Sequence, residues 1–129
     1  KEGSKLLKPG VFSKDYELQM AKLIEAELVK LGLITKEEIA NQNPDSPVYK
    51  KYFMHGTAHY LGLDVHDVGL YSRPFEKGMV LTCEPGIYIP EEGIGCRLEN
   101  DYLLTENGNF NLTAALPIEI DEIESLIKG

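Results

Sequence analysis

The spacing of the apolar residues changes near Phe53, and this change constrains the fold more than any other feature of the chain. From Ser13 to about Leu31, apolar residues recur every three or four positions, which predicts an amphipathic helix. Ser13 is the expected N-cap, and Gly32 stands where a glycine commonly closes a helix. Beyond Phe53, glycines become frequent and β-prone runs alternate with turns. The predicted class is therefore α+β, with a mostly antiparallel sheet.

Shorter elements are predicted on either side of this change. Thr35 and Glu38 have the spacing of a capping box, so a short helix should begin there and end before Pro44. The remaining predicted elements are, in chain order, a strand at Met79–Cys83, a break at Glu84-Pro85-Gly86, a strand at Ile87–Ile89, a strand at Gly95–Thr105, a hairpin turn at Glu106–Asn109, and an amphipathic helix at Ile120–Ile127.

The composition excludes several classes of partner. The chain has 129 residues, enough for one domain or a piece of one, and its 43% hydrophobic content is too high for disorder. Its 21 acidic and 13 basic residues give a net charge of −8, which argues against binding to nucleic acid or to an anionic membrane surface. No apolar run approaches the roughly 18 residues of a spanning helix. Two cysteines do not make a disulfide framework, so the cytoplasm is the expected location.

All three histidines lie between positions 55 and 66, and together they suggest a functional site. Histidine is the commonest transition-metal ligand, and His55 and His59 have the spacing of neighbours on one helical face. Any one of the three, including His66, is more often a hydrogen-bonded structural residue. Gly56 and Gly62 make a continuous helix doubtful, so His55 and His59 need not both bind a metal.

Two glutamates stand in strand patterns that are otherwise apolar. Glu84 follows a run typical of a buried strand, where a carboxylate is costly unless a cation or hydrogen-bond donors satisfy it. Strand alternation places Glu99 on the same face as Arg97, so a simple surface ion pair is the alternative for Glu99. Carboxylate oxygens combined with an imidazole suit Mn²⁺, Fe²⁺, Co²⁺ or Zn²⁺.

Four further side chains near these residues are expected to have structural roles. Cys83 and Cys96 alternate with the acidic and basic positions, so both are expected to be small buried residues rather than metal ligands. Asp64 and Asp67 lie in a glycine-rich stretch and are expected to cap their loop rather than to bind a metal.

Three separated blocks of sequence resemble one enzyme family. They are His55-Gly-Thr-Ala-His59-Tyr-Leu-Gly-Leu-Asp-Val-His66-Asp67-Val-Gly, Met79-Val-Leu-Thr-Cys-Glu84-Pro-Gly-Ile-Tyr88-Ile, and Gly95-Cys-Arg97-Leu-Glu99-Asn-Asp101. Their order and content are similar to those of the Xaa-Pro aminopeptidase (aminopeptidase P) and prolidase family. The resemblance covers nearly the whole chain. It implies the C-terminal half of a pita-bread fold, in which a curved, mostly antiparallel sheet carries helices on its outer face and two divalent metal ions are bound.

The resemblance also implies which residues bind the metals. His59 would be the histidine ligand, Glu84 a ligand that also serves as general base, and Glu99 the carboxylate that bridges both ions. Mn²⁺ is the expected metal, with Zn²⁺, Co²⁺ and Fe²⁺ as alternatives.

Four residues would act on the substrate or on the ligands. By resemblance, His55 and His66 are catalytic residues that hold the substrate and stabilise the charge developing on it. Tyr88 would contact the substrate, and Arg97 would orient the ligands as part of the catalytic machinery.

The family's metal site needs two aspartates that this chain does not supply. They come from strands upstream of the region that resembles residues 1–129, and Asp15 lies in the first predicted helix. Residues 1–129 are therefore expected to be a C-terminal fragment of the catalytic domain, inactive alone.

The resemblance implies that the parent protein is a metalloaminopeptidase. It would remove the N-terminal residue from peptides with proline at the second position, and it is expected to be a homo-oligomer. A prolidase, which cleaves only dipeptides, is the alternative within the same class. A non-catalytic pita-bread binding module is the alternative from another class, and it is disfavoured because His59, Glu84 and Glu99 are all present.

Overall fold

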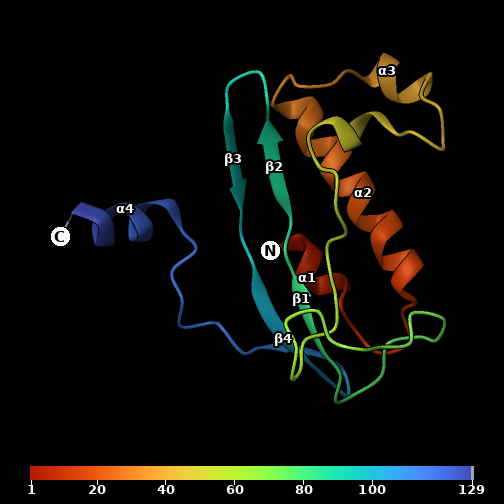
Figure 1. The fold of residues 1–129 in the computed structure, drawn as a ribbon, viewed down its shortest axis with the longest axis vertical. Helices are drawn as coiled ribbons and strands as arrows, with labels where there is room; N and C mark the ends of the chain where they lie inside the picture. The colour runs from red at the N-terminus through yellow and green to blue at the C-terminus, as the bar shows by residue number, and fades with distance from the viewer. Residues whose placement is uncertain (129) are drawn as a thin grey trace.

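The computed structural model describes residues 1–128, and its helices and strands confirm the α+β class (Figure 1). The elements are α1 (Glu2–Leu6), α2 (Ser13–Lys30), α3 (Lys36–Ala40), the 3₁₀ helix η1 (Val48–Lys51), β1 (Val80–Cys83), β2 (Gly86–Ile89), β3 (Ile94–Arg97), β4 (Asn100–Thr105), β5 (Gly108–Asn111) and α4 (Ile120–Lys128).

Helix α2 is the long helix that the sequence predicts, with a correction at its N-terminus. The N-cap is Phe12 and not Ser13, because Phe12 keeps an extended backbone while its carbonyl accepts the first helical hydrogen bond, from the Tyr16 N–H. Gly32 closes the helix with a φ of 73°, a left-handed conformation that glycine adopts without strain. The predicted capping box of α3 is confirmed, since Thr35 and Glu38 exchange both bonds.

The strands form two antiparallel ladders rather than one continuous sheet. One has the order β1-β4-β5, and the other pairs β2 with β3. The predicted strand at Gly95–Thr105 is consequently two strands, broken at Leu98 and Glu99. Pro85 lies opposite this break and has no N–H to donate. Among the described residues, the two segments are joined there only by the hydrogen bond from the Leu98 N–H to the Pro85 carbonyl.

Helix α2 packs against both ladders and so joins them. Its N-terminal half buries Tyr16 and Met20 in a cluster with residues of β1 and β4, among them the fully buried Leu81. Its C-terminal half buries Ile24 and Leu28 in a second cluster, against which side chains of β2 pack. The break between the ladders therefore lies over the middle of one helix.

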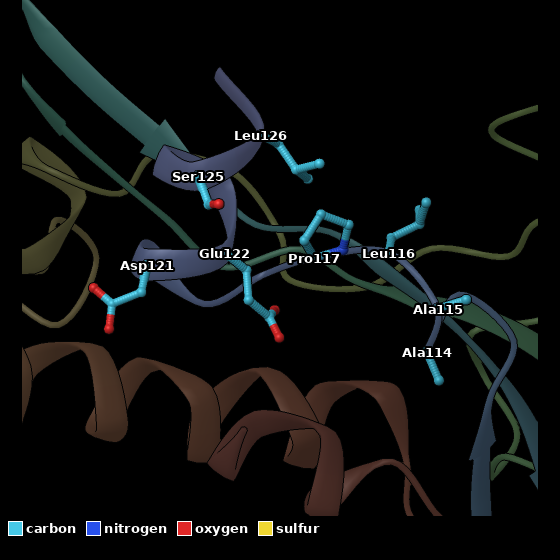
Figure 2. A pocket seen from close by; sticks show the side chains of 8 residues that line it. All are labelled: Ala114, Ala115, Leu116, Pro117, Asp121, Glu122, Ser125 and Leu126. Atoms are coloured by element: carbon cyan, nitrogen blue, oxygen red, sulfur yellow. The ribbon is translucent and has the colours of Figure 1, made fainter. Parts of the chain in front are cut away.

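Helix α4 lies to one side of the other elements (Figure 1). Its apolar side chains Ile120, Leu126 and Ile127 are exposed. Figure 2 shows the hollow between this helix and residues 114–117. None of the predicted site residues lines it. Within residues 1–128, no helix is both long enough and apolar enough to cross a bilayer.

The two cysteines differ in environment, which corrects one prediction. Cys83 is buried as expected, and its Sγ accepts a hydrogen bond from the Tyr16 hydroxyl at 3.4 Å. Cys96 is exposed, because every residue of β3 is exposed and no described segment covers that strand. Burial raises the pKa of the Cys83 thiol, which further lowers its reactivity.

We therefore expect a thiol reagent such as DTNB to modify one cysteine per folded chain at pH 8, and two in denaturant. Cys96→Ser should remove the fast phase and Cys83→Ser should leave it unchanged. Rapid modification of the Cys96→Ser variant in native buffer would show that Cys83 is not protected.

Candidate metal centre

His59 is positioned by a segment that runs alongside β1. The Thr57 carbonyl accepts from the Glu84 N–H at 2.9 Å, the His59 carbonyl from the Thr82 N–H at 3.0 Å, and the Val80 carbonyl from the Leu61 N–H at 3.2 Å. This pairing is that of an extended strand, so His55 and His59 do not share a helical face. This confirms the prediction from Gly56 and Gly62 that no continuous helix carries both histidines.

Glu84 and Glu99 meet because β1 pairs with β4. Cys83 is in register with Asn100, so the next residue of one strand and the preceding residue of the other meet at the end of this ladder. Glu84 is only 9% exposed, whereas Glu99 is exposed. One ligand atom from each of these glutamates and from His59 lies within 4.8 Å of the others. Two atoms that each lie about 2.0–2.2 Å from one ion are about 4 Å apart at most, so a small adjustment would let all three bind it.

The hydrogen bonds of His59 leave one of its nitrogens free to bind a cation. Its Nδ1 lies 2.9 Å from the Tyr60 carbonyl oxygen, which can only accept, so Nδ1 carries the proton. In the neutral ring, Nε2 then presents a lone pair, 3.3 Å from Oε1 of Glu84. Two acceptors facing each other at this distance repel unless a proton or a cation lies between them. This donor set fits a divalent metal ion.

Arg97 already places a positive charge beside both carboxylates. Its Nε lies 3.7 Å from Oε2 of Glu84, and its Nη2 lies 3.5 Å from Oε2 of Glu99. The guanidinium is half-exposed, so solvent weakens both interactions. Its position between the two carboxylates offsets their mutual repulsion and restrains their orientation.

His55 is engaged at both ring nitrogens and is not part of the three-residue cluster. Its Nδ1 donates to the Gly56 carbonyl at 2.7 Å, and its Nε2 accepts from the Tyr88 hydroxyl at 2.8 Å. The ring also packs edge-on against Phe53. His55 would have to give up its bond from Tyr88 in order to bind a metal through Nε2.

His66 lies on an exposed loop beside His59, with 4.3 Å between the ring centroids and 77° between the ring planes. Asp67 caps this loop as predicted, because its carboxylate accepts from the Leu63 and Val68 N–H groups at 2.9 and 2.8 Å. A Cβ at Gly62 would lie 1.8 Å from Oδ2 of Asp67, so a larger residue there would displace the Asp67 carboxylate from these bonds. These bonds fix the conformation of the loop, and the His66 ring lies against the ring of His59.

One residue that supports the site, Glu17 on α2, is not among the residues predicted from the sequence. Both of its carboxylate oxygens accept from the Thr57 N–H, at 2.9 and 3.1 Å. Burial raises the pKa of the Glu17 carboxyl, against the bonds from Thr57 and Ala58, which lower it. Its position three residues before Met20, beside the apolar stripe of the helix, was the available signal.

A histidine and two carboxylates at the break of an antiparallel sheet form the type of site found in metal-dependent enzymes with nitrogen and oxygen ligands. The chain belongs to metallopeptidase family M24, whose family model matches residues 1–106.

Relatives by sequence include proteins named Xaa-Pro aminopeptidase. That of Escherichia coli (strain K12) is 44% identical over 95% of this chain and 30% of its own length. A mitochondrial relative from Arabidopsis thaliana, named intermediate cleaving peptidase 55, is 39% identical over the whole chain and 26% of its own length. This chain thus spans about 30% of the length of the first of these relatives.

Solved structures confirm the predicted pita-bread fold. The chain superposes on a solved structure from Bacillus anthracis with a TM-score of 0.85 and 40% identity, covering 98% of this chain and 28% of that one. It superposes on E. coli aminopeptidase P, described with the inhibitor Pro-Leu, with a TM-score of 0.83 and 41% identity, covering 98% and 31%.

The geometry predicts that the three histidines differ in their effect on metal binding. In the full-length protein, His59→Ala should lose bound metal, because it removes the Nε2 lone pair beside Glu84. His55→Ala and His66→Ala should retain metal close to the wild-type amount. Metal content after dialysis, measured by plasma emission spectrometry, checks this. Equal loss in all three variants would mean that the histidines form one coordinating cluster.

Proposed function

We propose that this chain is part of the catalytic domain of a metal-dependent aminopeptidase that releases the N-terminal residue of peptides whose second residue is proline. The observation that carries this proposal is the convergence of His59, Glu84 and Glu99, with acceptor atoms of the first two facing each other at 3.3 Å. The substrate class is supported by the relatives named Xaa-Pro aminopeptidase and by the E. coli structure described with Pro-Leu.

We propose further that residues 1–129 form the C-terminal part of that domain and that two upstream aspartates complete a site for two divalent ions. Mn²⁺ is our proposed metal, with Zn²⁺, Co²⁺ and Fe²⁺ as alternatives, and an E. coli relative is described as zinc-substituted. Bound ions would polarise the scissile carbonyl and lower the pKa of the attacking water.

Glu84, Arg97 and His66 would have separate roles in the reaction. Glu84, nearly buried beside His59, would accept the proton of the attacking water as general base. Arg97 would hold the carboxylates of Glu84 and Glu99 in a fixed orientation. His66, exposed beside His59, would donate a hydrogen bond to the oxygen on which negative charge develops.

His55 and Tyr88 would act as a coupled pair on the substrate. The Tyr88 hydroxyl donates to the His55 ring, so the Tyr88 oxygen keeps a lone pair that a substrate N–H group could use. The pair joins a tyrosine on β2 to a histidine 33 residues earlier in the chain. We propose that this contact helps to hold the peptide.

The cytoplasm as the location and a homo-oligomeric parent stay predictions, and one relative carries a mitochondrial name. The non-catalytic module is disfavoured, because a binding protein has no need of a nearly buried glutamate facing a histidine lone pair.

The test is peptide cleavage by the full-length protein, metal-stripped and then reloaded with Mn²⁺. A tripeptide with proline at the second position should be cleaved, and the same tripeptide with alanine there should not. Residues 1–129 alone should be inactive, because two of the proposed ligands are missing. Cleavage of Xaa-Pro dipeptides but not tripeptides would identify a prolidase instead. Absence of cleavage in every peptide, or robust turnover by the 129-residue chain, would contradict the proposal.

The two histidines outside the cluster should affect catalysis without affecting metal content. His55→Ala and His66→Ala should each lower kcat/KM by about 10²–10⁴-fold, the range for positioned proton-transfer or oxyanion groups. Glu37→Ala, at an exposed position of α3, is the control and should leave kcat/KM unchanged. Wild-type kinetics in either histidine variant would remove that residue from the mechanism.

A further inference from the structure

A carboxylate from α2 reaches the loop that carries His55 and His59. Glu17 accepts from the Thr57 N–H with both oxygens, across a separation of 40 residues in sequence. Thr57 is fully buried, so water does not replace this acceptor readily. Among the described residues, the Glu17 carboxylate is the only partner of the Thr57 N–H. Removing it would leave a buried donor unsatisfied, which is costly.

The same peptide unit connects Glu17 to Glu84. The Thr57 carbonyl accepts from the Glu84 N–H at 2.9 Å, while the Thr57 N–H is held by Glu17. Two residues later, the His59 N–H donates to the Thr82 hydroxyl at 3.1 Å. Thr57 therefore lies in a line of hydrogen bonds that runs from helix α2 to the backbone of one candidate ligand, close to the backbone of another.

These hydrogen bonds link the position of the His59 segment to helix α2. The Thr57–Leu61 segment lies along β1 outside the named strands and bonds to it at only a few points. On its other side, the Glu17 carboxylate holds it to α2, which packs in both cores. The distance between His59 and Glu84 thus depends on a helix that contributes neither side chain.

We propose that Glu17 is a positioning residue of the metal centre, which holds the Thr57 peptide and thereby sets the spacing of His59 and Glu84. This inference rests on the proposed function only in so far as the cluster binds a divalent ion. It predicts that the location of the acceptor oxygen matters more than the negative charge.

The test compares Glu17→Gln, Glu17→Asp and Glu17→Ala in the full-length protein, with Glu27→Gln, Glu27→Asp and Glu27→Ala as matched controls. Glu27 is an exposed glutamate of the same helix, paired with Lys30. Co²⁺ affinity is measured by chelator competition, the ligand geometry by the visible Co²⁺ spectrum, and loop protection by hydrogen exchange at the Thr57 amide. None of these measurements uses a peptide substrate.

Glu17→Gln keeps an oxygen acceptor at the same reach, so its Co²⁺ affinity should fall by no more than about fivefold and its spectrum should be unchanged. Glu17→Asp keeps the charge but withdraws the oxygens, so together with Glu17→Ala it should lose about 10–100-fold in affinity, the range for groups that orient a ligand. Both should show faster exchange at Thr57. The Glu27 variants should match the wild type.

Three results would overturn the inference. The first is wild-type Co²⁺ affinity in Glu17→Asp and Glu17→Ala, even if Thr57 exchanges faster. The second is an equal loss in Glu17→Gln and Glu17→Asp, which would point to charge rather than position. The third is an equal loss in the Glu27 variants, which would indicate general destabilisation of α2. A wild-type protein that binds Co²⁺ but cleaves no Xaa-Pro peptide would contradict the proposed function and leave this inference standing.

Discussion

The antiparallel pairing of β1 with β4 brings two carboxylates to the same point of the sheet. Cys83 is in register with Asn100, so Glu84 and Glu99 meet where the ladder ends, one of them almost buried. Like charges placed opposite each other on strands are destabilising, and a buried carboxylate adds its own cost. Arg97 relieves part of this repulsion, although it is half-exposed and lies 3.7 Å from Glu84 and 3.5 Å from Glu99. A divalent cation bound to both carboxylates would reduce this repulsion further.

The break in the sheet coincides with the site, since Glu84 and Glu99 lie on either side of it. Pro85 lacks the N–H that a continuous ladder would need, and the two ladders separate there. Helix α2 bridges the break by packing its two halves in two clusters, one under each ladder. The same helix supplies Glu17, so the element that holds the ladders together also holds the loop of His59. Stability and placement of the site therefore depend on the same helix.

Membership of metallopeptidase family M24 agrees with the arrangement of the side chains around His59 and Glu84. The facing lone pairs of His59 and Glu84, the tautomer set by the Tyr60 carbonyl and the guanidinium of Arg97 are each consistent with a metal centre. His55 and His66 differ from His59 in their contacts, since one is paired with Tyr88 and the other stands on an exposed loop. These differences distinguish His59 experimentally from His55 and His66.

The sequence by itself determined the α+β class, the long helix, the capping box of α3 and the presence of two acids, Glu84 and Glu99, in apolar strand patterns. These features can be predicted because periodicity, capping and the cost of buried charge act locally. It predicted His59, Glu84 and Glu99 as a group through motif resemblance. Only the tertiary structure decided the split of the predicted Gly95–Thr105 strand, the exposure of Cys96 and the support from Glu17. Each of these depends on which segment packs opposite a given residue, and local sequence carries no record of a partner 40 residues away.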